Sequence, residues 1–579
     1  MNKSSRKKII IILVLILLAI GVAAGCYSCA RRQAAEEPVT EEPSPTPEPT
    51  PEEPTEPAEP PLEYVAFDPD QAYSYLSDIY CGFSNHGALF LYEASFDKAP
   101  ESDDNLVYIF AFEMYEDETD FSKGPLTTME KAHSMRAELD PDYYQLFEQF
   151  IPALLVDGEY VPIAEGRYAD NIGAIAGNQS DFPTYTSKKG LLIDVNMVGT
   201  DKLTDLNLTH AEFNMPISFF LGTEEEASTT PMVTFDYQGQ TYYFKEQSLL
   251  NYDALFSSFT NSGYVTTAIL LNDMNENHME LIHPKSRTKT SKSKYYMFNT
   301  TDEEGAKALQ AAILFLSERY TDGEHGMVHN WVIANEINQH TDWNYMDTTD
   351  LEEYVTAFEH SFRTCYNAIK SNYAAARVYF SIDKEWNSNG GTNEKFFNSK
   401  ELVTTFARMA SEKGNYDWSL AIHPYPINLG RVTFWNHSYN HTADAQKLTF
   451  MNLNVLTDYM EQEELLNPDG NVRHIAVTEL GFTSSTKGEK MQAIAYAYCY
   501  RILEDNPYID MFLLNRQTDA LSEMKEQLAY GLYNHDGSPK YIVEVFAGID
   551  GPDSHQYDQM ILNAVGVGSM DEALALAKP

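Results

Sequence analysis

The chain has 579 residues, of which 43% are hydrophobic and 13% aromatic, so its length and composition fit a globular protein of more than one domain. Its formal net charge of −46 at pH 7 argues against nucleic acid and anionic lipid surfaces as partners of the folded body. The one Cys-x-x-Cys motif has no second half and there is no His-Glu-x-x-His motif, so the sequence predicts neither a metal site nor a cofactor.

The N-terminal segment, residues 1–32, predicts export and attachment to a membrane. Basic residues precede an apolar run from Ile9 to Gly25, an order that places the following chain outside the cytoplasm. The run meets Ala-Ala-Gly-Cys26, which resembles a lipobox whose Cys26 would be lipidated. Arg31 and Arg32 suit an uncleaved anchor equally well, so both forms of attachment stay open.

A linker and few cysteines are expected next. Residues 33–62 are rich in Pro and Glu, a composition that predicts an extended spacer with no packed core. Beyond this linker the chain contains Cys81, Cys365 and Cys499. We expect buried thiols rather than a disulfide framework.

Residues 63–187 predict a small, mostly-β accessory module. Runs with strand-like alternation span residues 87–96, 105–116 and 159–168, with turn-forming residues between them. One early helix is expected over residues 69–80. This pattern favours a β-sandwich-like arrangement.

Strands and helices alternate over residues 188–579, a pattern typical of a parallel sheet built from βα units. Eight strand-like runs are expected to end close to residues 196, 214, 273, 336, 383, 423, 479 and 515. The fold class predicted is therefore α/β, with a (β/α)8 TIM barrel following the β module. A doubly wound open sheet is the alternative, but no Gly-rich phosphate loop follows the first strand.

Polar residues stand at the end of every predicted barrel strand. They are Asn196, Asn214, Asn272, Asp273, Asn335, Glu336, Asp383, His423, Tyr425, Glu479 and Asn515. Barrel enzymes build their sites from these strand ends, so the pattern predicts a polar cleft. Two of the residues, Glu336 and Glu479, each end an apolar run. Two facing carboxylates are the smallest set of catalytic groups that a glycosidase uses.

The strand ends resemble those of clan A glycoside hydrolases: Asn335-Glu336 on the fourth strand, His423-x-Tyr425 on the sixth and Glu479 on the seventh. The segments K-K-G-L-L-I-D-V, A-I-L-L-N-D, W-V-I-A-N-E-I-N, H-P-Y-P and V-T-E-L-G-F are similar, more closely, to a bacterial family of glycosidase-like barrels, domain of unknown function 5722, over about residues 70–550. The resemblance implies a retaining mechanism with Glu336 as acid/base and Glu479 as nucleophile. It also implies that Asn335 binds the sugar 2-hydroxyl, that Tyr425 orients Glu479 and that His423 shapes the same wall.

Further residues are expected to line the substrate cleft. Asn272 and Asp383 end their strands, and Trp386 is a candidate sugar-stacking platform, with ordinary packing as its alternative. Clan members commonly carry a tryptophan at the end of the eighth strand, where this chain has Asn515-Arg516. Another aromatic residue would substitute there, or Arg516 would reach an acidic or modified sugar, or the barrel would bind without cleaving.

The sequence thus predicts an extracytoplasmic, membrane-tethered glycoside hydrolase that acts on a polysaccharide or oligosaccharide without a cofactor. The alternative is a non-catalytic glycan-binding or cell-surface interaction protein on a degenerate barrel. A metal-dependent hydrolase using His283, His423 and Asp383 is disfavoured, because their loops lack ligand spacing. The sugar, the linkage, endo versus exo action and the oligomeric state are left open.

Overall fold

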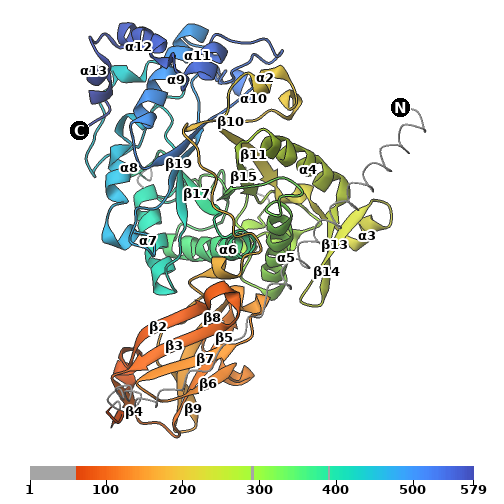
Figure 1. Cartoon of the computed structure of the whole chain (residues 1–579), viewed down its shortest axis with the longest axis vertical. Coiled ribbons are helices and arrows are strands. Elements are labelled where there is room, and N and C mark those ends of the chain that lie inside the picture. Colours follow the sequence, from red (N-terminus) through yellow and green to blue (C-terminus); the bar gives the residue numbers. More distant parts are fainter. Residues whose placement is uncertain (1–59, 289–292, 389–391) are drawn as a thin grey trace, which may run out of the picture. The chain divides into compact units, whose positions relative to one another are not determined.

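The computed structural model describes residues 60–288, 293–388 and 392–579 (Figure 1). The predicted membrane segment, Cys26 and almost all of the predicted linker lie outside the described residues. Within the described ranges, no helix is both long enough and apolar enough to cross a bilayer. Residues Leu62–Pro579 form one compact unit, and this second unit of the chain carries every element described below.

The N-terminal part of this second unit is a strand module. One antiparallel sheet contains β2 (Leu76–Phe83), β3 (Phe90–Phe96) and β7 (Ser134–Leu139), and another contains β6 (Thr127–Glu130), β5 (Leu106–Glu113), β8 (Glu148–Val156) and β9 (Glu159–Pro162). A short pair, β1 (Glu63–Val65) and β4 (Lys98–Pro100), is parallel. The rings of Phe90 and Phe150 lie 4.6 Å apart, so the two larger sheets share a core.

The early helix of this module is shorter than predicted. A 3-10 helix covers Pro69–Ser74, and β2 begins at Leu76. The expected helix over residues 69–80 is wrong in its second half, because Leu76 and the residues after it pair with β3, starting with Leu76 opposite Phe96. Pairing with a distant strand outweighs the local preference of this segment.

Eight parallel strands then close into a barrel, which confirms the predicted α/β fold class. In order around the barrel they are β10 (Lys189–Leu192), β11 (His210–Pro216), β15 (Val265–Leu271), β16 (Asn330–Ile333), β17 (Arg377–Asp383), β18 (Ser419–His423), β19 (Ile475–Leu480) and β20 (Ile509–Leu514). The barrel closes where β10 pairs with β20, with Gly190 opposite Leu513. No edge is left open, so the predicted open-sheet alternative is wrong.

Helices follow most of the strands, as a βα pattern requires. In the part of the chain that the structure describes, the long helices are α4 (Glu246–Asn261), α5 (Glu303–Arg319), α6 (Leu351–Asn372), α7 (Ser399–Glu412) and α9 (Glu489–Glu504). Shorter ones are α2 (Asp201–Thr204), α3 (Glu224–Ala227), α8 (Asn454–Tyr459), α10 (Leu521–Met524), α11 (Ile542–Gly548), α12 (Asp558–Val565) and α13 (Met570–Ala575). Figure 1 shows α5 and α6 running beside the barrel strands. Between β11 and α4 the chain forms a hairpin of β13 (Met232–Tyr237) and β14 (Gln240–Lys245), and β12 (Leu221–Gly222) pairs with β14 as a third strand.

The barrel interior is a packed apolar core. Its members come from six consecutive strands, β15 to β20, and are Ile269, Leu271, Val332, Tyr379, Ala421, Ala476, Met511 and Leu513. Because these side chains fill the interior, a ligand can reach the barrel only at its ends. The polar residues at the carboxyl-terminal ends of the strands therefore surround the natural place for a site.

The fourth strand ends earlier than predicted. β16 stops at Ile333, and Ala334 and Glu336 have positive φ values of 64° and 39°. A non-glycine residue in the left-handed region stores strain that the surrounding structure must hold, and such residues cluster at functional sites. Glu336 therefore belongs to a sharp turn beyond the strand, whereas Glu479 lies within β19.

Three cysteines lie within the described residues. Cys81, Cys365 and Cys499 are buried free thiols, as predicted. The last module strand ends at Pro162 and the first barrel strand begins at Lys189. The predicted division between residues 187 and 188 falls in this interval and stays a prediction.

Candidate active site

Glu336, His423 and Glu479 meet at the carboxyl-terminal end of the barrel. Glu336 follows β16, His423 is the last residue of β18, and Glu479 is the next-to-last residue of β19. His423 Nδ1 lies 2.9 Å from Glu336 Oε1 and 3.8 Å from Glu479 Oε2. These two carboxylate oxygens are therefore no farther apart than the sum of the two distances, 6.7 Å.

The imidazole of His423 is fixed on both of its nitrogen atoms. Nδ1 forms the hydrogen bond to Glu336, and Nε2 lies 3.1 Å from the hydroxyl oxygen of Thr478. The residue is buried, with 2% of its surface exposed. A buried ring held at both ends keeps its orientation, so His423 sets the spacing of the two carboxylates.

Burial and mutual contact perturb the pKa values of this group. Burial raises the pKa of Glu336, and the hydrogen bond to His423 counteracts part of that rise. Burial lowers the pKa of His423, but the hydrogen bond to Glu336 and the charge of Glu479 outweigh it, so the net change is upward. Glu336 and His423 thus form a coupled pair in which a proton is retained above the usual range of a glutamic acid.

Glu479 accepts its hydrogen bonds from a different set of groups. Tyr425 Oη donates to Glu479 Oε1 at 2.8 Å. Asn515 Nδ2 donates to the same oxygen at 3.2 Å and to Tyr425 Oη at 3.0 Å. The Glu479 side chain is 31% exposed, against 15% for Glu336. The second carboxylate is therefore oriented by neutral donors and is open to a ligand.

The turn that carries Glu336 is braced from β17. The Glu336 amide donates to Ser381 Oγ at 2.8 Å. Asp383 accepts from Asn338 Nδ2 and from Gln339 Nε2, both at 2.7 Å, so its carboxylate is occupied by the loop after Glu336. Asp383 therefore supports the loop after Glu336 rather than making the predicted substrate contact, and no sequence pattern had pointed to Ser381 or Asn338 as further supports.

Two predicted substrate-binding asparagines differ in what they face. Asn335 precedes Glu336 and is partly exposed at the mouth of the barrel, where its predicted contact with a sugar stays a prediction. Asn272 is 2% exposed, and its Nδ2 donates to the carbonyl oxygens of Leu281 (3.0 Å) and Met297 (3.3 Å). Asn272 therefore secures the loop after β15 instead of offering its amide nitrogen to a substrate.

Trp386 does not offer the stacking surface expected of it. Its exposed fraction is 0%, and its indole meets the ring of Tyr459 edge-on with centroids 5.2 Å apart. A sugar can stack only on a ring face that solvent reaches. The alternative given with the prediction, ordinary packing, is the correct one.

Asn515 and Arg516 occupy the end of β20. Arg516 Nε donates to Asn515 Oδ1 at 3.2 Å, and Arg516 Nη2 lies 3.0 Å from Glu523 Oε1. The ion pair with Glu523 offsets the positive charge that was expected to attract an acidic sugar. The peptide bond between Asn515 and Arg516 is cis.

Sequence reasoning missed Glu212 and Tyr295, which lie close enough to Glu479 for its charge to raise their pKa values, and Trp343, which stacks on Tyr295. Glu212 of β11 is 2% exposed, and burial, with a further effect of Glu479, raises its pKa well above the usual range. Tyr295 and Trp343 are both partly exposed, and their rings stack with centroids 6.1 Å apart. An acid in the middle of a predicted barrel strand was a usable signal for Glu212, whereas the two aromatic rings come from separate loops and offered no signal.

A metal-dependent site receives no support. Within residues 60–288, 293–388 and 392–579, no group of three or more His, Cys, Asp or Glu side chains is arranged to hold a metal ion. His283, one of the three residues considered for such a site, uses its Nδ1 to accept from the amide of Lys285 at 3.2 Å. It thereby caps the 3-10 helix Pro284–Ser286.

Comparisons with solved structures return proteins of low sequence identity. A family 39 glycoside hydrolase from the gut symbiont Bacteroides cellulosilyticus WH2 is 14% identical, with a TM-score of 0.43 over 78% of this chain and 79% of that one. The exo-β-1,4-mannosidase Op5Man5 from Opitutaceae bacterium strain TAV5 is 12% identical, with a TM-score of 0.38 over 65% and 60%. A β-glucosidase from Thermotoga maritima is 10% identical, with a TM-score of 0.37 over 60% and 84%.

The sequence matches the model of a protein family. No protein with a curated description matches the chain. The model of a family described as DUF5722, family of unknown function, matches residues 181–573. The match begins later than the expected residue 70, so the strand module lies outside it. It covers the whole barrel and more than half of the sequence, and the chain therefore belongs to the DUF5722 family.

Proposed function

We propose that this protein is a retaining glycoside hydrolase that acts on a polysaccharide or oligosaccharide through Glu336 and Glu479. The observation that carries the proposal is the pair of carboxylates held on either side of His423, with oxygens no more than 6.7 Å apart. Retaining glycosidases place their two carboxyl groups about 5–5.5 Å apart and inverting ones about 6.5–9.5 Å apart. The upper bound of 6.7 Å for these two oxygen atoms lies below most of the inverting range, which supports a retaining mechanism.

The different surroundings of the two acids support different roles. Glu336 is the more buried, and its raised pKa suits a general acid that must be protonated to donate to the leaving oxygen. Glu479 is more open, and Tyr425 and Asn515 orient its Oε1. That arrangement leaves Oε2 for attack on the anomeric carbon.

The proposed reaction has two steps. Glu479 attacks the anomeric carbon and forms a covalent glycosyl–enzyme bond, while the proton of Glu336 passes to the departing glycosidic oxygen. Glu336, now ionised, takes a proton from a water molecule, whose oxygen attacks the anomeric carbon and releases Glu479. The two inversions give net retention of configuration, and no cofactor is required.

Its proposed location is the extracytoplasmic side of the cell membrane. The basic start, the apolar run and the Pro/Glu-rich linker of residues 1–62 support export and tethering. Whether Cys26 is lipidated or the segment stays as an uncleaved anchor can be tested by labelling cells with a fatty-acid analogue. A Cys26→Ala variant should lose the label only if the lipoprotein form is correct.

The catalytic proposal is tested with a panel of 4-nitrophenyl glycosides of neutral and acidic sugars, in both anomeric forms. We expect Glu336→Gln and Glu479→Gln to reduce hydrolysis of any substrate that the wild type cleaves by at least about 1,000-fold, since each removes a group that acts only in the transition state. The exposed Glu318→Gln on α5 serves as the matched control. The configuration of the first product, followed by NMR, distinguishes retention from inversion.

Glycan binding without cleavage is the second candidate. The observation that favours it is the end of β20, where Asn515 bonds to Tyr425 and Glu479, Arg516 pairs with Glu523, and no aromatic ring is presented. This candidate predicts saturable binding of a glycan with no turnover of the panel. Survival of more than a few per cent of activity in Glu336→Gln or Glu479→Gln would remove the two-glutamate mechanism.

A further inference from the structure

A cavity of about 430 Å3 lies beside the candidate active site, between the segments that follow β10 and β20. Its volume is within the range of about 300–1,000 Å3 that small-molecule sites occupy. Residues that line it include Asp194, Val195, Asn196, Arg516, Thr518 and His535. Arg516 follows directly on Asn515, which donates to Glu479, so the cavity adjoins the proposed nucleophile.

Two buried polar atoms lie in the wall of the cavity without a hydrogen-bond partner in the described residues. Thr518 Oγ1 and Asp519 Oδ2 are buried atoms of residues that line it, and neither has a hydrogen-bond partner in the described part of the chain. Asp519 is 2% exposed. Leaving a buried carboxylate oxygen unpaired is costly, and such groups commonly mark the position of a water molecule or a ligand.

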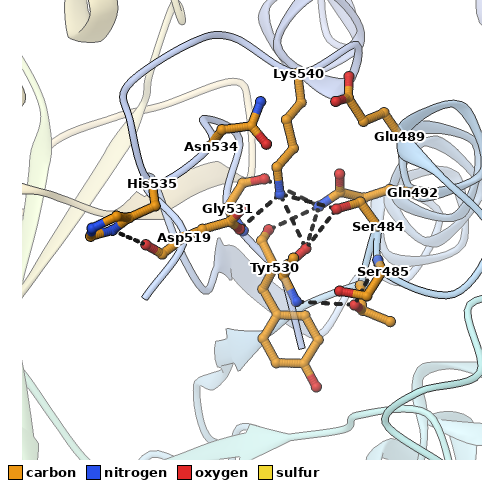
Figure 2. Close-up of polar contacts among 12 residues, drawn as sticks. Ser484, Ser485, Glu489, Gln492, Asp519, Tyr530, Gly531, Asn534, His535 and Lys540 are labelled. Carbon is orange, nitrogen blue, oxygen red and sulfur yellow. Dashed lines mark hydrogen bonds and ion pairs between the residues drawn. The ribbon is translucent and has the colours of Figure 1, made fainter. Parts of the chain in front are cut away.

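The wall that carries these groups is rigid. Figure 2 shows the ammonium group of Lys540 between Asp519 and Ser484, at 2.7 Å and 3.1 Å from their oxygen atoms. Asp519 Oδ1 also accepts from the Gly531 amide at 2.7 Å. Gln492 Nε2 holds the same loop through the carbonyl oxygens of Tyr530 and Gly531. A wall fixed by buried bonds can bind a ligand without first being ordered.

The charges of the cavity favour a neutral ligand. Arg516 is the cation of the wall, and Glu523 pairs with it at 3.0 Å. Asp194 adds a carboxylate, whose Oδ1 accepts from the amide nitrogen and the side chain of Asn196. An anionic sugar would therefore meet net negative charge. Val195, 52% exposed, supplies an apolar face for the C–H groups of a sugar ring.

We propose that this cavity is a second sugar subsite, which binds a neutral sugar unit of the same chain whose neighbouring unit lies between Glu336 and Glu479. The inference rests on the proposed function and adds to it the position of a second subsite and the neutral character of the sugar unit bound there. Hydroxyl groups of the bound unit would pair with the solvent-accessible side chains of Asp194 and Asn196, and its apolar face would lie on Val195. The expected acidic sugar at Arg516 is thereby replaced by a neutral one.

The test compares substrates of one and two sugar units on the full-length protein. Val195→Trp fills the cavity, and Leu250→Trp places the same ring at a similarly exposed position on α4. For neutral 4-nitrophenyl glycosides, we expect the ratio of kcat/KM for the disaccharide to that for the monosaccharide to fall at least tenfold in Val195→Trp. The ratio should stay within twofold in Leu250→Trp. An unchanged ratio in Val195→Trp would overturn the subsite.

Binding separates this inference from the proposed function. If the wild type cleaves nothing, the proposed hydrolase is wrong, and the subsite is then tested by titrating neutral disaccharides into the wild type and Val195→Trp. A tenfold weaker binding in Val195→Trp supports the subsite, and absence of binding to the wild type overturns it. Tighter binding of disaccharides that contain a uronic acid would overturn the assignment to a neutral sugar.

Discussion

Two walls of the barrel mouth use polar side chains in different ways. On the near wall (Glu336, His423, Tyr425 and Glu479), the polar groups bond to the two carboxylates. On the far wall (Asn515, Arg516, Asp519 and Glu523), most polar groups bond to partners within their own loop or to Lys540 behind it. Asn515 alone among these eight residues bonds across to the other wall.

The two walls therefore differ in role, with the reacting groups on the near wall and structural contacts on the far wall. Near-wall groups converge on atoms that a substrate would touch, so their removal should change the reaction rate more than the stability. Most far-wall groups pair within their own loop or with Lys540, so their removal should change the stability first. Single substitutions on each wall test whether rate and stability separate in this way.

Lys540→Met should cause the largest loss, and it should be a loss of stability. Lys540 is 3% exposed and its ammonium lies 2.7 Å from Asp519 Oδ1. Removing one partner of a buried ion pair leaves the other charge uncompensated, at a cost of about 3–5 kcal/mol. Chemical denaturation should show this decrease in the free energy of unfolding.

The double variant Lys540→Met, Asp519→Asn provides the control for charge. Because it removes both charges, it should recover part of the stability lost in Lys540→Met. If the single variant lost less than about 1 kcal/mol, the far wall would not depend on this pair.

Tyr425→Phe should give the next largest effect, this time on the rate. Its hydroxyl donates to Glu479 Oε1 at 2.8 Å. A hydrogen bond to a charged group contributes about 1.5–3 kcal/mol, so we expect kcat on an activated glycoside to fall by about 10- to 100-fold. The midpoint of thermal unfolding should move far less than in Lys540→Met.

Tyr530→Phe is the matched control for this change. The ring of Tyr530 lies 5.9 Å from that of Tyr425, and its hydroxyl is buried without a hydrogen-bond partner in the described part of the chain. Loss of this hydroxyl should leave kcat within about twofold. Equal losses in the two variants would show that packing, rather than the bond to Glu479, sets the rate.

Asn515→Ala should show an intermediate effect on both properties, because Asn515 joins the two walls. Its amide donates to Tyr425 Oη at 3.0 Å and to Glu479 Oε1 at 3.2 Å, and it is 6% exposed. We expect about 1–2 kcal/mol less stability and about a tenfold lower kcat/KM. A change in only one of the two properties would place Asn515 wholly on one wall.

The near wall was largely predictable from the sequence, for a physical reason. Glu479, His423 and Tyr425 stand at or next to the ends of apolar, β-branched runs, and parallel strands bring such ends together. Glu336 was found by the same pattern, although its strand stops three residues earlier. The turn depends on positive φ values at Ala334 and Glu336. The backbone conformational preferences of these two residue types do not predict such values.

The far wall was not predictable, because its contacts join distant segments. Lys540 reaches Asp519 across a loop, and Arg516 is paired with Glu523 rather than left free for a substrate. Trp386 failed for a related reason, since a tryptophan after a strand is a stacking platform or a core residue depending on what covers it. Tyr459 packs against it, from a helix that sequence reasoning did not connect with it.

The smallest expected change is a shift of the pH profile in His423→Gln. Burial raises the pKa of Glu336, and the hydrogen bond to His423 lowers it again in part. Without the imidazole this lowering is lost, so the pKa of Glu336 should rise further. Because a general acid acts in its protonated form, the basic limb of kcat/KM should move to higher pH.

The direction of this shift decides between two roles for His423. If the histidine only supported the barrel wall, its replacement would lower the rate at every pH and leave the limb in place. If it supplied the catalytic proton itself, the limb would disappear from the profile. A limb displaced to higher pH, measured with Tyr530→Phe as a neighbouring control, would identify Glu336 as the acid and His423 as the residue that holds its pKa down.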